Sequence, residues 1–148
     1  MRKLFAIAVV LAILGLAVFW VVTIPATVPA SALGSHTPNA ANGKAMFYAG
    51  GCESCHAAAD ATGEEAFKLG GGIKLVSPFG TFVAPNISPD PEHGIGGWTT
   101  LDFVNAMKFG IDDEGQHLYP AFPYTSYQRM RLDDIRDRHV GHLLGTAD

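Results

Sequence analysis

The chain opens with a short basic segment followed by a long apolar one. Met1, Arg2 and Lys3 precede residues 4–23, LFAIAVVLAILGLAVFWVVT, which carry no charge. Twenty such residues are long enough for a helix to span the hydrocarbon core of a membrane. The basic residues before them favour an N-terminus that stays in the cytoplasm. We therefore expect residues 1–24 to form an N-terminal transmembrane helix that anchors the chain in the bacterial inner membrane.

A cleaved signal peptide is the alternative. Ala30-Ser31-Ala32 has the small-x-small form of a cleavage site, and cleavage there would release a chain that begins at Leu33. The apolar run is longer than the core of an ordinary signal peptide, and the tripeptide lies well beyond it, so we favour a retained anchor. Both interpretations deliver the rest of the chain to the periplasm.

Three later segments have the features of helices. Residues 39–49 predict one that Asn39 or Asn42 caps. Residues 98–109 predict the clearest one, with Thr99 or Thr100 as the cap and Gly110 after its end. Residues 132–144 predict a last helix whose apolar face is interrupted by charged residues.

The segments between these helices are rich in glycine and proline. Residues 25–38 form a linker without hydrophobic periodicity, and residues 57–97 predict long loops with little regular structure. A flat apolar cofactor would give such loops a surface to wrap. We expect one domain, residues 39–148, after the anchor and the linker.

Charge narrows the range of partners. Without Arg2 and Lys3 the chain has 8 basic and 14 acidic residues, a formal charge of −6. An acidic exported domain argues against nucleic acid and against anionic lipid surfaces as partners.

Residues 51–56, GCESCH, contain both cysteines of the chain. Two cysteines three positions apart, with histidine after the second, form the attachment pattern of a c-type haem. In one helical turn the thiols of Cys52 and Cys55 would reach both haem vinyl groups and add across them as thioethers. The imidazole of His56 would then lie under the ring as the proximal iron ligand. The sequence therefore predicts one covalently attached haem c.

Other interpretations of the cysteines fit less well. A thioredoxin-type motif needs a βαβ setting, which the surrounding sequence does not offer. Zinc needs four ligands, and the remaining histidines are scattered apart from His139 and His142, which we interpret as solvated surface residues. A disulfide at this spacing is strained and leaves His56 unexplained.

Several stretches together resemble a known family. They are residues 43–47, AGGCESCH at 49–56, LGGG at 69–72, PFGTF at 78–82, PNISPDPEHGIGGW at 85–98 and LYPAFPYTSYQRM at 118–130. The chain resembles a membrane-anchored class I c-type cytochrome. In particular, it is similar to a haem domain of the cytochrome c subunits that serve periplasmic alcohol and gluconate dehydrogenases.

The resemblance implies an all-α, cytochrome c-like helical fold with long haem-wrapping loops. It assigns the covalent cysteines to Cys52 and Cys55, the proximal histidine to His56 and the distal methionine to Met130. Trp98 and the tyrosines of 119–127 would contact the haem or its propionates. Of the other methionines, Met107 lies on the apolar face of a helix, so we expect it in the core.

The end of the chain departs from the family pattern. The last helix of the family usually carries an aromatic residue that packs on the first helix, whereas residues 137–142 here read DRHVGH. We expect a truncated or altered C-terminal helix, a weaker helix crossing and a haem protein of low stability.

Two function classes follow from these residues. The first is an electron carrier that accepts electrons from a dehydrogenase and passes them to a quinone, cytochrome or oxidase of the respiratory chain. The second is a haem enzyme or a gas or peroxide sensor with an open sixth iron position. A methionine ligand raises the haem potential, and no nucleophile triad, phosphate loop or paired carboxylates indicate catalysis. We therefore favour the carrier and do not expect an enzyme.

Overall fold

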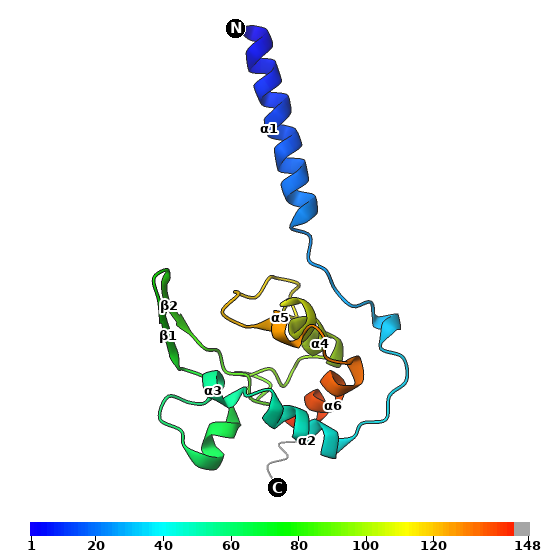
Figure 1. Ribbon diagram of the computed structural model, residues 1–148, viewed down its shortest axis with the longest axis vertical. Helices are drawn as coiled ribbons and strands as arrows, with labels where there is room; N and C mark the ends of the chain where they lie inside the picture. Colours follow the sequence, from blue (N-terminus) through cyan, green and yellow to red (C-terminus); the bar gives the residue numbers. More distant parts are fainter. Residues whose placement is uncertain (144–148) are drawn as a thin grey trace.

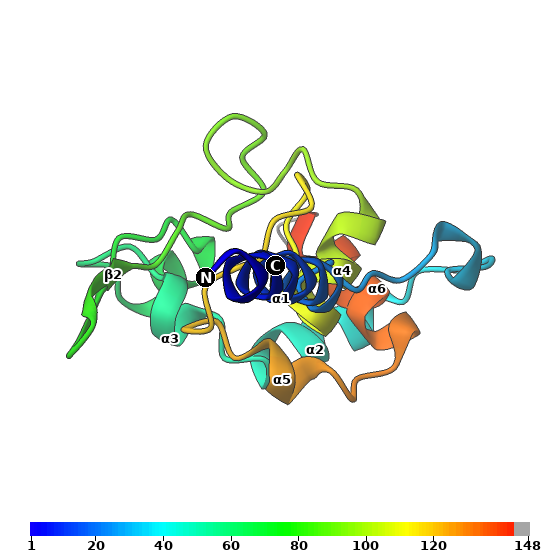
Figure 2. The same ribbon diagram turned by 90° about the horizontal axis from the view of Figure 1, so that it is seen from above.

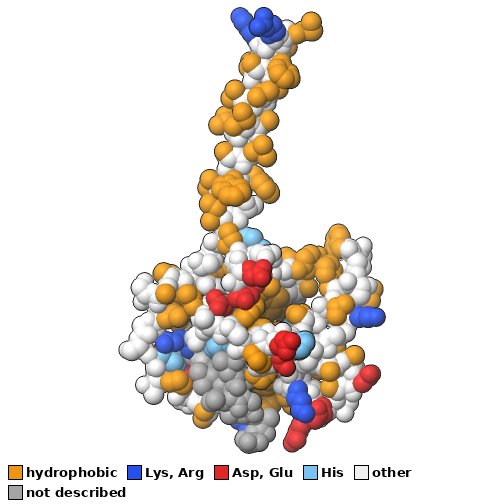
Figure 3. Space-filling model, turned by 180° about the vertical axis from the view of Figure 1, so that it is seen from behind, with side chains coloured by type: hydrophobic (Ala, Val, Ile, Leu, Met, Phe, Trp, Pro, Cys, Tyr) orange, Lys and Arg blue, Asp and Glu red, His pale blue; other side chains and the backbone are white. Residues whose placement is uncertain are grey.

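A computed structural model describes the backbone of residues 1–143 and the side chains as far as His139. Helix α1, Arg2–Val22, stands apart from the domain that contains the other helices, and the linker joins the two (Figure 1). All of its residues are exposed, and its mean hydropathy of 2.9 makes it long and apolar enough to cross a membrane. Apolar side chains surround this rod, and basic groups lie only at its far end (Figure 3).

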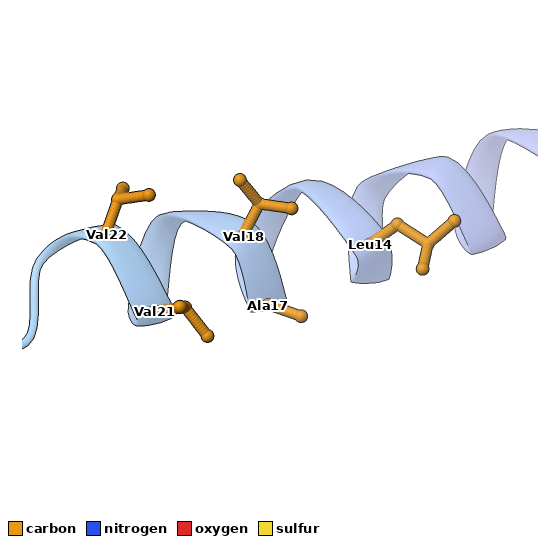
Figure 4. Close-up of a pocket in the computed structure, with 5 residues that line it drawn as sticks. All are labelled: Leu14, Ala17, Val18, Val21 and Val22. Carbon is orange, nitrogen blue, oxygen red and sulfur yellow. The ribbon is translucent and has the colours of Figure 1, made fainter.

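A shallow apolar groove on the last turns of α1 is lined by Leu14, Ala17, Val18, Val21 and Val22. These side chains follow one another at spacings of three and four residues along one face of the helix, and they are exposed (Figure 4). A helix that is apolar all round and unburied by protein is suited to lipid.

The linker is held along the surface of the domain. It contains a short 3-10 turn, Ala30–Ala32, and the backbone N–H of Val28 donates to Asn105 Oδ1 at 2.7 Å. Arg136 donates to the carbonyl of Leu33, and His36 Nε2 lies 2.6 Å from Asp137 Oδ1. These bonds tie the linker to two helices of the domain, although its sequence has no periodicity.

The helix starts follow from capping residues. Helix α2, Ala40–Ala49, begins after Asn39, whose side chain accepts from the N–H of Asn42. Helix α4, Thr100–Phe109, begins after Thr99, which forms a capping box with Asp102, and ends at Gly110 in the left-handed region. Both helices confirm the predictions from the sequence, as does α6, Leu132–Leu143.

The core lies between α4, α6 and the loop before α4. Its buried members are Ile95, Phe103, Val104, Met107 and Ile135. Met107 is 4% exposed, which confirms the prediction that it belongs to the core. Seen along α1, α4 and α6 lie on one side of the axis, and α3, Glu53–His56, lies on the other with the hairpin described below (Figure 2).

The polar residues of α6 do not prevent it from packing across α2. Asp137 is 4% exposed, and its carboxylate accepts from the N–H of Asn39 at 2.9 Å and from Asn42 Nδ2 at 2.9 Å. Burial alone would raise the pKa of Asp137, but these bonds and His36 hold it below its ordinary value. The network therefore stabilises the crossing at neutral pH. This contribution is complete above the ordinary pKa of the carboxyl and is lost as the pH falls through its lowered pKa in the folded protein.

The expectation of an all-α fold is not confirmed. Strands β1, Lys74–Ser77, and β2, Gly80–Val83, form an antiparallel hairpin that pairs Leu75 with Phe82. The segment between α3 and α4 also contains a 3-10 turn, η2, Gly63–Lys68. The backbone N–H and C=O groups of the two strands find hydrogen-bond partners in each other. Gly80, with a φ of 130°, allows the tight turn between them.

Candidate haem site

The two cysteines lie on one helical turn directly after α2. Gly51 adopts a φ of 58°, which turns the chain from α2 into α3. The carbonyl of Cys52 then accepts from the N–H of Cys55 at 3.2 Å and from the N–H of His56 at 2.9 Å. Both thiols are free, so the disulfide interpretation does not hold in this structure. The turn presents two thiols and an imidazole from one short segment.

His56 is oriented by a backbone carbonyl from a distant loop. Its Nδ1 lies 2.9 Å from the carbonyl oxygen of Pro85, an acceptor, so Nδ1 carries the proton and donates. This tautomer leaves Nε2 with the lone pair that a metal needs, and the donated bond raises the basicity of the ring.

A close backbone contact holds Pro85 in place. Gly71, with a φ of 74°, donates its N–H to the carbonyl of His56 at 2.7 Å. A Cβ on Gly71 would lie 2.5 Å from the carbonyl carbon of Pro85 and 2.6 Å from the nitrogen of Asn86. The LGGG stretch therefore brings the His56 carbonyl and the Pro85 loop together in a space where only glycine fits.

Arg138 of α6 packs against the same turn. The Arg138 side chain is 1% exposed, and its Nη2 donates to the Sγ of Cys52. Its guanidinium fills the space that a Cβ on Gly50 would occupy. Its Nη1 has no hydrogen-bond partner among the described residues. Burial raises the pKa of the Cys52 thiol, and the charge of Arg138 acts in the opposite direction. No local pattern in the sequence indicates a buried cation beside Cys52.

We expect Arg138→Leu to raise the free energy of unfolding. Burying a charge without an ionic partner is costly, and even whole buried ion pairs can be replaced by apolar residues with a gain in stability of up to about 1–4 kcal/mol. The loss of the contact over the Tyr127 ring, at 5.7 Å, reduces this gain by roughly 0.5–1 kcal/mol. Thermal and denaturant unfolding of the haem-loaded protein would measure the difference.

Arg131→Leu is the matched control, because Arg131 immediately precedes the same helix and is exposed. We expect it to change stability by no more than about 0.5 kcal/mol. A loss of stability in the Arg138 variant would contradict the prediction. The low stability expected from the sequence stays a prediction until such curves exist.

The interpretation of His139 as a solvated residue is wrong. His139 is 2% exposed, its ring stacks on Phe103 at 4.9 Å, and Nδ1 lies 3.2 Å from Thr100 Oγ1. Helical spacing puts Ile135, Arg138 and His139 on one face, and the contact of α6 with α2 and α4 buries that face. The side chain of His142 lies outside the described residues.

The stretch from Tyr119 to Met130 approaches the cysteine turn at one point. Helix α5, Tyr124–Tyr127, places the hydroxyl of Tyr127 2.9 Å from the carbonyl of Gly50. Met130 follows on the loop before α6, and its half-buried side chain packs against the core. Its backbone is held at both ends, since its N–H donates to Tyr127 O at 2.9 Å and its carbonyl accepts from Lys108.

The residues of this site fit a c-type haem. Two free thiols on one turn match covalent attachment, and a histidine with one nitrogen committed to a carbonyl matches proximal ligation. Among the side chains that the structure describes, no group of three His, Cys, Asp or Glu residues gathers as a metal site would require.

Comparisons with known proteins point to the same cofactor. The family model for cytochrome c matches residues 40–137. A diheme cytochrome c-type protein of Cereibacter sphaeroides is 54% identical over 101 residues, which are 68% of this chain and 34% of the relative.

Two further relatives are subunits of dehydrogenases. The cytochrome c subunit of a quinone-dependent alcohol dehydrogenase of Gluconobacter oxydans is 44% identical over 94 residues, 64% of this chain and 19% of the relative. The gluconate 2-dehydrogenase cytochrome c subunit of Pantoea cypripedii is 34% identical over 105 residues, 71% of this chain and 23% of the relative. The matched part of the chain thus spans about a third or less of each of these relatives.

Proposed function

The chain belongs to the cytochrome c family, and we propose that it accepts electrons from a membrane-associated dehydrogenase and passes them to the respiratory chain on the periplasmic side. The observation that supports this most directly is the turn that joins Cys52, Cys55 and a His56 oriented by Pro85. The relatives that are subunits of alcohol and gluconate dehydrogenases support a dehydrogenase as the electron donor.

The chain's own residues would hold and tune the cofactor. Bound haem c supplies an iron that gains and loses one electron. Each thiol would add across a vinyl group of the haem, with a new C–S bond to one vinyl carbon and the thiol hydrogen on the other, so that no oxidant is needed. His56 Nε2 would bind the iron while Nδ1 keeps its bond to Pro85 O, which fixes the plane of the ring.

We assign the sixth ligand position to the thioether of Met130 and propose one haem for this chain, which has one Cys-x-x-Cys-His motif. A soft thioether favours the reduced iron and so raises the potential. A carrier with both axial positions filled needs no substrate pocket and no acid or base. The second candidate, a haem enzyme or sensor, requires an open sixth position.

Carbon monoxide and redox titration separate these two candidates. The carrier predicts one reversible one-electron step, together with a reduced protein whose spectrum changes little within seconds of adding carbon monoxide. Rapid formation of a carbon monoxide complex by the unmodified protein would favour the open-site enzyme or sensor instead. The measurement needs only the haem-loaded protein and absorption spectra.

We further propose that α1 is a retained anchor and that the haem domain lies in the periplasm. Bacterial membranes that contain the protein should keep its haem stain after a high-salt wash, because about twenty buried apolar residues hold a helix irrespective of ionic strength. A soluble periplasmic form that begins at Leu33 would show that the signal-peptide interpretation is correct.

A further inference from the structure

The β1–β2 hairpin exposes large apolar side chains, two of them at or beside its turn (Val76 and Phe79) and one at its base (Val83). Val76 is 83% exposed, Phe79 is 87% exposed and Val83 is 58% exposed. Phe79 lies at the turn itself, between Pro78 and Gly80, where its side chain has no core to enter. Such a concentration of apolar surface on a narrow projection indicates contact with another apolar phase.

A chain of contacts places this hairpin beside the end of α1. The ring of Phe82 in β2 stacks on Tyr119, with the centroids 4.1 Å apart and the planes 21° apart. Two residues before Tyr119, Nε2 of His117 lies 3.1 Å from the carbonyl of Thr23, the residue that ends α1. The base of the hairpin is therefore linked, through one short loop, to the point where the apolar helix leaves the domain.

The hairpin projects to the same side of the domain as α1 (Figure 1). Phe79 lies three positions before Phe82, and at a rise of about 3.3 Å per residue the turn lies roughly 10 Å along the hairpin from the residue that stacks on Tyr119. Apolar groups of interfacial elements enter a bilayer by about 5–10 Å. The turn therefore extends beyond the Tyr119 loop on the side of the domain from which α1 leaves, by a length similar to such an insertion depth.

The charge of the hairpin is compatible with lipid. Although the exported part of the chain is acidic, residues 69–83 contain one charged residue, Lys74, and no carboxylate. Lys74 lies at the base of β1, four residues before Pro78 at the turn. The projecting end in Figure 3, at the upper right, likewise shows hydrophobic side chains and no acidic one.

From these contacts we infer that Val76 and Phe79 form a second membrane contact, which inserts into the outer interface of the same phospholipid bilayer that α1 spans. The inference rests on the proposed retained anchor. Two contacts on one side of the domain would fix its tilt relative to the membrane, which a single helix on a linker does not. The ligand is uncharged acyl chain and glycerol backbone, so insertion does not depend on anionic headgroups.

Photolabelling from lipid tests this contact in the full chain. The haem-loaded protein is placed in nanodiscs of phosphatidylcholine that carries a diazirine on its acyl chain, and labelled peptides are mapped by mass spectrometry. We expect label on α1 and on residues 76–79, at a level on the order of tenfold above that on η2. The η2 turn lies on the side of the domain away from α1 (Figure 1).

The variant Val76→Ser with Phe79→Ser should lose the hairpin label and keep the α1 label and the haem spectrum. Thr81→Ser, an exposed change on the same hairpin, is the matched control and should label as the unmodified protein does. Label on α1 with no more on the hairpin than on η2 would overturn the second contact and leave the anchor intact. Absence of label on α1 would overturn the anchor and this inference together. Crosslinking of the hairpin to a dehydrogenase subunit in place of lipid would overturn the inference in favour of a protein partner.

Discussion

Replacing both Cys52 and Cys55 by alanine should abolish covalent haem, and either single change should reduce it severely. The two thiols are the only sulfhydryl groups in the chain, and one helical turn holds them together. A single remaining thioether leaves the ring attached at one edge, where it can rotate away from His56. Haem staining after denaturing electrophoresis measures what stays bound when all non-covalent contacts are lost.

Ser54→Ala is the matched control for this experiment. Ser54 lies between the cysteines on the same turn, is exposed, and donates its hydroxyl to the carbonyl of Gly51 at 2.7 Å. Its loss weakens the turn slightly and leaves both thiols in place, so haem staining should persist. If haem of the unmodified protein passed entirely into acidified organic solvent, covalent attachment would be disproved.

The features that the sequence predicts correctly are those encoded by neighbouring residues. Helix α4 begins and ends where its capping residues and Gly110 indicate, because the bonds that cap a helix join residues within one turn. The apolar stretch of α1 needs no partner to be recognised. The GCESCH motif carries its chemistry within six residues, so the candidate attachment site is evident before any fold is known.

The features that the sequence does not reveal depend on contacts between distant residues. The Nδ1 of His56 meets a carbonyl 29 positions later, and the N–H of Val28 meets a side chain 77 positions later. No pattern among neighbouring residues predicts either hydrogen bond. The sequence does not predict the hairpin, because each strand has only four residues. Glycine and proline flank these strands, and that composition is equally typical of loops.

For Arg138 and His139, the sequence does not reveal which face of α6 is buried. Charged and polar side chains in a helix are usually on its solvated face, and that prior led to the wrong interpretation of His139. Ile135 is fully buried, and its helical neighbours at i+3 and i+4 follow it inward when α6 crosses α2 and α4. The position of the crossing, which the sequence does not specify, decides which face is buried.

Met130→Ala should lower the haem reduction potential and let the reduced protein bind carbon monoxide readily. Axial ligands set haem potentials over about 0.8 V, so loss of a thioether ligand should shift the potential by roughly 0.1 V or more. The backbone bonds of Met130 to Tyr127 and Lys108 do not involve its side chain, so the loop should keep its course. Absorption spectra of both oxidation states, a redox titration and carbon monoxide binding are the measurements.

Two variants show whether such effects are specific to Met130. Met107→Leu keeps the volume of a core residue that is 4% exposed, and His117→Ala removes an exposed imidazole that contacts the end of α1. Neither change should remove the methionine-to-iron absorption band or open the iron to carbon monoxide. If the Met130 variant keeps its low-spin spectrum and potential while one of these loses them, the sixth ligand belongs to that residue and the assignment to Met130 is wrong.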